Sequence, residues 1–268
     1  GYGNVMRAMG GDNLSYCLGD ASKAYSGIST DPMWVEAFEA AGITQTPENG
    51  FGSTPLTLYR RHVLMLHPDI VVIYDELEAK EAVRWDWLLH SPPEFSIDSN
   101  RQTVTTCNTE KAFTATTSLF SNEQITLSQT DRFTVPPPGA SDTTYPNQWH
   151  LTACIDGKAK TRILAVIQIK PDNDTPVKIQ RNGNILTCGY WTIEAGLDAS
   201  SPAMLNVTHS MKKSSFHYGN ASLVLGGQSY VPADRSSSIL YDKINGEYLV
   251  MEPVSYTHLR AHETLANL

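Results

Sequence analysis

The segments that decide the fold are Tyr59–Leu77, YRRHVLMLHPDIVVIYDEL, and Val83–His90, VRWDWLLH. Two apolar runs flank Pro68-Asp69, and a proline followed by an aspartate between such runs is typical of a turn. We therefore expect Tyr59–Leu77 to form an antiparallel hairpin with its turn at Pro68-Asp69.

The hairpin carries charged residues on both strands, and two registers bring opposite charges together. If the loop has two residues, His62 lies opposite Asp75, with Arg61 opposite Glu76. A shift of one residue instead places Arg61 opposite Asp75, with Arg60 opposite Glu76. We interpret these residues as structural ion pairs that fix the register, each stabilising the hairpin by about 0.2–1 kcal/mol.

The next strand, Val83–His90, separates its side chains into two faces, because successive residues of a strand point in opposite directions. One face holds Trp85, Trp87 and Leu89, which is typical of a core. The other face holds Arg84, Asp86, Leu88 and His90. His90 is the functional candidate of this strand, and a hydrogen-bonded structural histidine is the alternative.

Outward from this region, the sequence contains one helix signal. Thr30-Asp31-Pro32 provides a cap and a first-turn proline, and apolar residues follow at helical spacing until Gly42, so a helix is expected from Pro32 to Ala41. The remaining patterned segments indicate strands: Leu56–His67, Ile70–Leu77, Val83–His90, Phe113–Phe120, Trp149–Ile155, Arg162–Ile169, Tyr190–Ile193, Leu223–Leu225, Ile239–Tyr241 and Tyr248–Met251.

Three dipeptides, Asp156-Gly157, Asn182-Gly183 and Asn245-Gly246, indicate hairpin turns, and Val135–Pro146 is expected to be a long loop. Many short strands with such turns predict an all-β fold, an antiparallel β-sandwich of the large two-sheet type with one short helix near the N-terminus. The patterned region, 1–252, is expected to be a single sandwich region.

Composition excludes several classes of protein. The 268 residues include 20 Lys and Arg against 28 Asp and Glu, a formal net charge of -8, which argues against a nucleic-acid partner. Apolar residues make up 41% and charged residues 18%, so the chain can bury a large core. No apolar run approaches the roughly 20 residues of a membrane helix, so no membrane span is expected. The four cysteines contain no C-x-x-C spacing and are interpreted as buried thiols.

The last segment, Pro253–Leu268, PVSYTHLRAHETLANL, continues no strand pattern and resembles translated sequencing-adaptor sequence from an environmental reading frame. We expect it to be a non-native or disordered tail. A short natural helix, Thr257–Leu268, is the alternative.

Several motifs resemble the C-terminal β-sandwich region of heparinase II/III-like polysaccharide lyases over about Gly10–Pro171. They are GDASKAY at Gly19–Tyr25, the hairpin, WLLHS at Trp87–Ser91, QWHL at Gln148–Leu151, and the strand Ile163–Ile169 with Lys170-Pro171. The resemblance implies an N-terminal α/α toroid before the sandwich, with a cleft between the two. It also implies a secreted or periplasmic location.

The chemistry that the resemblance implies is β-elimination on an acidic, uronate-containing polysaccharide. The family's H-x-H element and its later aspartate have no match here, so the chain is expected to be inactive alone. By matching motif, His90, His150 and Tyr25 are candidates to face the cleft. His90 is also the implied metal ligand, and a divalent metal such as zinc could be held in a full-length protein.

A second interpretation is a non-catalytic module that binds carbohydrate or braces another domain. In that case Trp85, Trp149 and Trp191 are the candidate stacking surfaces for sugar rings. A glycoside hydrolase accessory domain is a weaker alternative, because no paired carboxylates occur in a recognisable motif.

Overall fold

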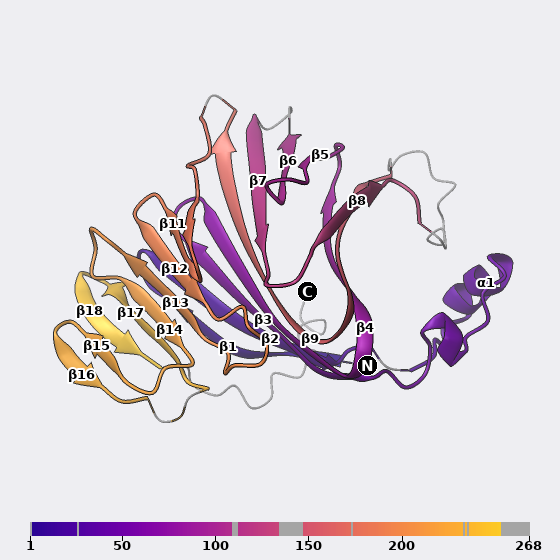
Figure 1. Ribbon diagram of the computed structural model, residues 1–268, viewed down its shortest axis with the longest axis horizontal. Coiled ribbons are helices and arrows are strands. Elements are labelled where there is room, and N and C mark those ends of the chain that lie inside the picture. The colour runs from indigo at the N-terminus through magenta and orange to yellow at the C-terminus, as the bar shows by residue number, and fades with distance from the viewer. Residues whose placement is uncertain are drawn as a thin grey trace, which may run out of the picture.

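A computed structural model describes residues 2–25, 27–108, 112–133, 147–172, 174–232, 234 and 236–252. Most of them form antiparallel strands in two large sheets, with one small hairpin, one α-helix and one short 3-10 helix, Pro47–Asn49 (Figure 1). The expected loop Val135–Pro146 and the tail Pro253–Leu268 lie outside the described residues.

The first sheet has nine strands in the order β1-β2-β3-β4-β9-β7-β6-β5, with β8 paired to β9. Every pairing in it is antiparallel. Its strands are β1 Tyr2–Gly10, β2 Leu14–Lys23, β3 Leu56–Leu66, β4 Ile70–Ser91, β5 Ser96–Asp98, β6 Thr103–Asn108, β7 Phe113–Phe120, β8 Thr126–Thr130 and β9 Trp149–Pro171.

The second sheet has seven strands in the order β10-β11-β12-β13-β14-β17-β18, again all antiparallel. They are β10 Gln180–Asn182, β11 Ile185–Cys188, β12 Trp191–Ala195, β13 Leu205–His209, β14 Ser215–Tyr218, β17 Ser238–Ile244 and β18 Glu247–Met251. A two-stranded sheet, β15 Leu223–Leu225 and β16 Gln228–Tyr230, lies beside them (Figure 1).

The main core lies between the two large sheets. Alternate residues of β2, β3, β4 and β9 meet alternate residues of β11, β12, β13, β14 and β17, among them Leu64, Val72, Ile193, Val207 and Phe216, each fully buried. Two sheets that share one apolar core in this way make a β-sandwich, as the strand patterning predicted.

A second apolar cluster lies on the other face of the nine-stranded sheet. It contains Leu77, Trp87, Leu119, Ile155 and Ile163, all from that one sheet. One sheet can bury apolar residues against itself only by curling, and Figure 1 shows its β8 end bending away from the seven-stranded sheet. The curl therefore gives the nine-stranded sheet an inner face that the seven-stranded sheet does not cover.

The helix α1, Pro32–Ala40, matches the expected one. The Asp31 carboxylate accepts a hydrogen bond from the backbone N–H of Met33 and caps the helix, and Gly42 follows with a positive φ of 69°. No described residue of α1 is buried, and Figure 1 shows the helix projecting away from the sheets.

The hairpin of β3 and β4 adopts the second of the two registers. Leu66 lies opposite Ile70, so the loop has three residues, 67–69, and Arg61 lies opposite Asp75. The two-residue loop with His62 opposite Asp75 is wrong, and His62 faces Tyr74 instead. The extra loop residue shifts the register by one position, and opposite charges still face each other across the strands: Arg61 lies opposite Asp75, and Arg60 lies opposite Glu76.

Four expected strands are in fact two long ones, which corrects the sequence interpretation. Ile70–Leu77 and Val83–His90 belong to the 22-residue β4, and Trp149–Ile155 and Arg162–Ile169 belong to the 23-residue β9. The expected hairpin turn at Asp156-Gly157 is therefore wrong. Gly157 has a positive φ of 67°, but it lies within β9, at the point where the register against β4 shifts. Its left-handed conformation therefore belongs to a β-bulge and not to a hairpin turn.

The other two turn dipeptides lie between paired strands. Asn245-Gly246 joins β17 to β18 with positive φ at both residues, as a type I′ turn requires. Asn182 pairs with Ile185, so the turn between β10 and β11 consists of Gly183 and Asn184, one residue later than expected. Among the described residues, no helix is both long enough and apolar enough to span a membrane.

Candidate functional site

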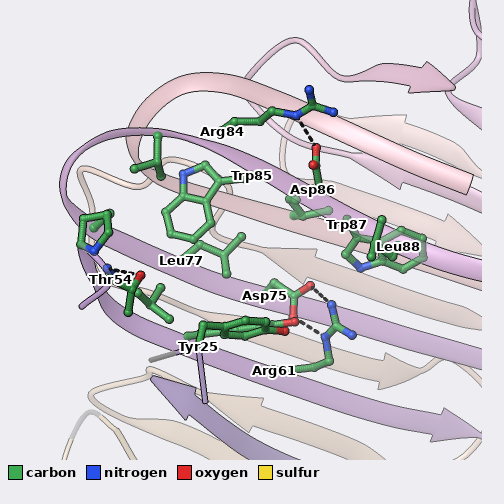
Figure 2. A pocket seen from close by; sticks show the side chains of 16 residues that line it. Tyr25, Thr54, Arg61, Asp75, Leu77, Arg84, Trp85, Asp86, Trp87 and Leu88 are labelled. Carbon is green, nitrogen blue, oxygen red and sulfur yellow. Dashed lines mark hydrogen bonds and ion pairs between the residues drawn. The ribbon is translucent and has the colours of Figure 1, made fainter. Parts of the chain in front are cut away.

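A pocket of about 460 Å³ opens on the inner face of the curled nine-stranded sheet. Its lining comes from β3 and β4, from Ile163 of β9, and from the segments that hold Tyr25 and Thr54 (Figure 2). The long β4 supplies both ends of the lining, from Asp75 to Leu88, because the strand bends at its register shifts. We call this cavity the inner-face pocket.

An ion pair forms the floor of the inner-face pocket. Arg61 donates from Nε to one Asp75 oxygen at 2.7 Å and from Nη2 to the other at 2.8 Å (Figure 2). The side chain of Asp75 is 1% exposed and that of Arg61 is 34% exposed. Burial raises the pKa of the Asp75 carboxyl, and the Arg61 guanidinium opposes that shift. This two-point pairing holds the guanidinium in a fixed orientation beneath the pocket.

Aromatic rings form the walls. The rings of Tyr25 and Tyr59 stack with centroids 5.9 Å apart and planes 19° apart, and the Arg61 guanidinium lies 5.6 Å from the Tyr59 centroid. Burial, with the nearby Asp75 carboxylate, raises the pKa of Tyr59 to about 12, so its hydroxyl stays protonated at neutral pH. Trp85 donates from its indole N–H to the carbonyl of Lys158 at 2.8 Å, which fixes the plane of its ring.

Trp87 lies deeper in the same wall, beside the Arg61–Asp75 pair (Figure 2). It is 4% exposed, and its indole N–H lies close enough to the Asp75 carboxylate to oppose the rise that burial causes in the pKa of that carboxyl. The indole is therefore a second donor to Asp75 beside Arg61. A second ion pair, Arg84 Nε to Asp86 at 2.9 Å, lies on the more exposed side of the strand.

His90 and His150 face each other on the opposite side of the β4–β9 pair. They are cross-strand partners whose rings meet edge to face, with centroids 4.7 Å apart. His150 is 9% exposed and packs against Phe133 at 4.0 Å, and its burial beside His90 lowers the pKa of its imidazole. Tyr25 lies in the inner-face pocket instead, so it does not join the two histidines.

Two imidazoles are too few to hold a zinc ion, which takes at least three protein ligands. No group of three or more His, Cys, Asp or Glu residues that could hold a metal occurs in the part of the chain that the structure describes. The residues near His90 therefore do not fit a metal by themselves.

His62 and Glu76 lie on the core side of the same hairpin. Glu76 accepts hydrogen bonds from His62 Nε2 at 2.9 Å and from the Tyr218 hydroxyl at 2.9 Å, and these contacts lower the pKa of Glu76 against its burial. Since Nε2 carries the proton, Nδ1 of His62 accepts from the Tyr16 hydroxyl at 3.0 Å. Burial lowers the pKa of the His62 imidazole, so the neutral ring links the two sheets.

Two of the expected carbohydrate-contact residues lie away from the inner-face pocket. Trp149 packs against the small cluster of Phe95, Val104 and Leu151. Trp191 is 5% exposed and lies in the core between the sheets, where a sugar has no access to its ring. Trp85 is the one of the three that lines the pocket.

Sequence reasoning missed two aromatic residues of the pocket and the partners of His62. Tyr59 stands on the same face of its strand as Arg61, and that alternation is a signal from which it could have been found. For Trp87 the alternation of its strand predicts a core position only. Tyr16 and Tyr218 reach His62 from distant strands, and no local pattern marks them.

Comparison with known proteins gives relatives by structure only. No family model matches the sequence, and no curated protein matches it. A solved heparinase III with methylated lysines has a TM-score of 0.50 at 13% identity, covering 81% of this chain and 27% of its own. A heparan sulfate lyase from Pedobacter heparinus has a TM-score of 0.44 at 10% identity, covering 96% of this chain and 28% of its own.

The chain thus spans little more than a quarter of the length of these neighbours. At sequence identities of 10–13%, these structures show a similar fold, and they do not show that the chain shares the activity of the neighbours. The chain has a β-sandwich fold similar to part of a heparinase III.

Proposed function

We propose that the chain is the β-sandwich part of a polysaccharide lyase that cleaves a uronate-containing, acidic polysaccharide by β-elimination. The observation that carries the proposal is the agreement between two independent lines. The GDASKAY, hairpin, WLLHS and QWHL motifs stand in the order of heparinase II/III-like lyases, and the fold is similar to part of a heparinase III.

Elimination requires that the uronate carboxylate be neutralised before a base takes the C5 proton. The C4–oxygen bond then breaks, and an acid protonates the leaving oxygen. All three groups must meet at one sugar unit. In this chain Tyr25 lines the inner-face pocket, whereas His90 and His150 lie on the opposite face of β4 and β9. We therefore propose that the chain alone is not a competent lyase.

We propose that an N-terminal α/α toroid completes the active site, so that residues 1–252 form the sandwich region of a longer protein. The share of the neighbours' length that the chain covers supports this view. An extended acidic polysaccharide would then be the partner of the whole protein, with a secreted or periplasmic location. The net charge of -8 argues against a nucleic-acid partner.

The DNA sequence upstream of the codon for Gly1 tests this proposal without any assay. The proposal expects an open frame that encodes a run of toroid-like helices with Asn, His and Tyr residues able to act in elimination. A stop codon directly upstream, or an unrelated domain in the same frame, contradicts it and favours a non-catalytic carbohydrate-binding or structural module.

A further inference from the structure

We propose that the inner-face pocket binds a neutral pyranose unit of a polysaccharide. The sugar ring would stack on the aromatic wall, and Arg61 would donate hydrogen bonds to its oxygens. This pocket is separate from His90 and His150, and the proposal stands whether or not the chain takes part in elimination.

The aromatic wall suits the face of a sugar ring. Tyr25 is 61% exposed, so its ring offers a free surface, and the stack on Tyr59 supports it from behind. The hydrogen bond from Trp85 to the carbonyl of Lys158 fixes a second ring in the same pocket. Aromatic rings held in this way offer a large contact area at low entropic cost, and the C–H face of a pyranose is apolar enough to pack on them.

The charges of the pocket favour a neutral ligand. Its charged lining residues are Arg61, Asp75, Arg84 and Asp86, and they form two ion pairs. Neither pair leaves a full positive charge for a carboxylate or a sulfate. Arg61 uses Nε and Nη2 on Asp75, and its Nη1 makes no hydrogen bond with any residue that the structure describes, so it can donate to hydroxyl oxygens.

A buried indole lies next to this ion pair and would report on a ligand. Trp87 is 4% exposed, and its indole N–H interacts with the Asp75 carboxylate and opposes the rise that burial causes in the pKa of that carboxyl. A ligand that contacts Arg61 would therefore change the surroundings of the Trp87 indole. The volume of about 460 Å³ also falls within the range of roughly 300–1,000 Å³ that is typical of small-molecule sites.

The test uses the complete chain labelled with ¹⁵N, in which each of the five tryptophans gives one indole N–H resonance. Single Trp→Phe variants assign these resonances. The probes are hexasaccharides of β-linked glucose, of β-linked mannose and of N-acetylglucosamine, with a hexauronate as the anionic comparison. We expect a neutral probe to shift the Trp85 and Trp87 resonances saturably, to leave Trp191 in place, and to bind equally at low and high salt.

Three variants with the same probe separate stacking from other effects. Tyr25→Ala removes an exposed ring and is expected to weaken binding about tenfold, the effect of losing one aromatic contact. Tyr25→Phe keeps the ring and should bind as the wild type does. Tyr190→Ala removes an equally exposed ring, 64% exposed and outside the pocket, and should change nothing.

Several results would overturn the proposal. One is the absence of saturable shifts at Trp85 and Trp87 with every neutral probe. Another is binding of the hexauronate alone, with an affinity that falls as salt rises. A third is equal affinity of Tyr25→Ala and Tyr190→Ala. No lyase activity is measured, so failure here is distinct from failure of the proposed elimination.

Discussion

The Asp75 carboxylate is held at two points by Arg61 and is almost fully buried, with a side chain that is 1% exposed. Asp75→Ala would leave the guanidinium without its partner and open space in the floor of the inner-face pocket. We expect the free energy of unfolding to fall by about 1–3 kcal/mol, measured by urea titration.

The matched control is Glu78→Ala on the same strand. Glu78 pairs with Lys160 at 2.9 Å, but the two side chains are 35% and 54% exposed, so the change should cost less than about 0.5 kcal/mol. Equal stability of the Asp75 variant and the wild type would show that the ion pair does not support the fold.

His217 gives the stability a defined pH dependence. Burial lowers the pKa of its imidazole from 6.5 to about 4, although the Glu194 carboxylate opposes the shift. The neutral ring makes hydrogen bonds with Asn206 at 3.1 Å and with Ser215 at 3.0 Å. Below pH 6.5 the imidazole of His217 is protonated in the unfolded chain, whereas in the folded chain it stays neutral until about pH 4. The contribution of the neutral His217 ring to stability is therefore lost as the pH falls from 6.5 to about 4.

His217→Gln is expected to lose less stability between pH 6.5 and pH 4 than the wild type does, as thermal unfolding at a series of pH values would show. A slope in His217→Gln that equals the wild-type slope would mean that His217 does not carry this dependence.

At the scale of elements, the bulge at Gly157 lets β9 continue through the curl. Its φ of 67° is unfavourable for a residue with a side chain, although a Cβ there would meet no atom within 4 Å. Gly157→Ala should therefore lower the free energy of unfolding by about 1–2 kcal/mol through the backbone alone. Gly3→Ala, at an exposed strand position with ordinary contacts, should change it by less than about 0.5 kcal/mol. Equal unfolding midpoints in urea for the two variants would contradict this account of the bulge.

The segment Pro253–Leu268 is predicted to be dispensable, because its sequence does not continue the strand pattern that ends at Met251. Truncation after Glu252 should leave the thermal midpoint unchanged. A midpoint lowered by several degrees, which corresponds to about 1 kcal/mol or more in a chain of this size, would show instead that the segment packs as a real element.

The elements that local sequence predicts best are those with a strong local signal. Asp31 and Pro32 mark the start of α1, and Asn245-Gly246 marks a turn, because capping and positive φ depend on neighbouring residues alone. The bulge at Gly157 has the composition of a turn, and only pairing with β4 distinguishes the two. In β1 the glycines and polar residues interrupt the alternation, so no strand is predicted there, whereas the alternation of Leu14, Tyr16 and Leu18 is a signal from which β2 could have been predicted.

In the candidate site, too, the sequence predicts the features that depend on neighbouring residues and misses those that depend on the tertiary fold. Alternation along Val83–His90 separated Trp85 from His90 correctly, and the charge pattern allowed the Arg61–Asp75 pair. The pocket itself depends on the curl of the sheet, which brings Tyr25 to the bent end of β4. A tertiary bend of this kind leaves no signal in a single strand.

For the whole molecule, the central proposal is that this sandwich is part of a lyase of uronate-containing polysaccharides and that it needs a further domain to act. The direct measurement is absorbance in the unsaturated-uronate band, with a panel of uronate polysaccharides, for this chain and for the full reading frame that contains it. We predict product from the full frame and none from the chain alone. Robust product from the chain alone, or none from the full frame with any substrate of the panel, would contradict the account.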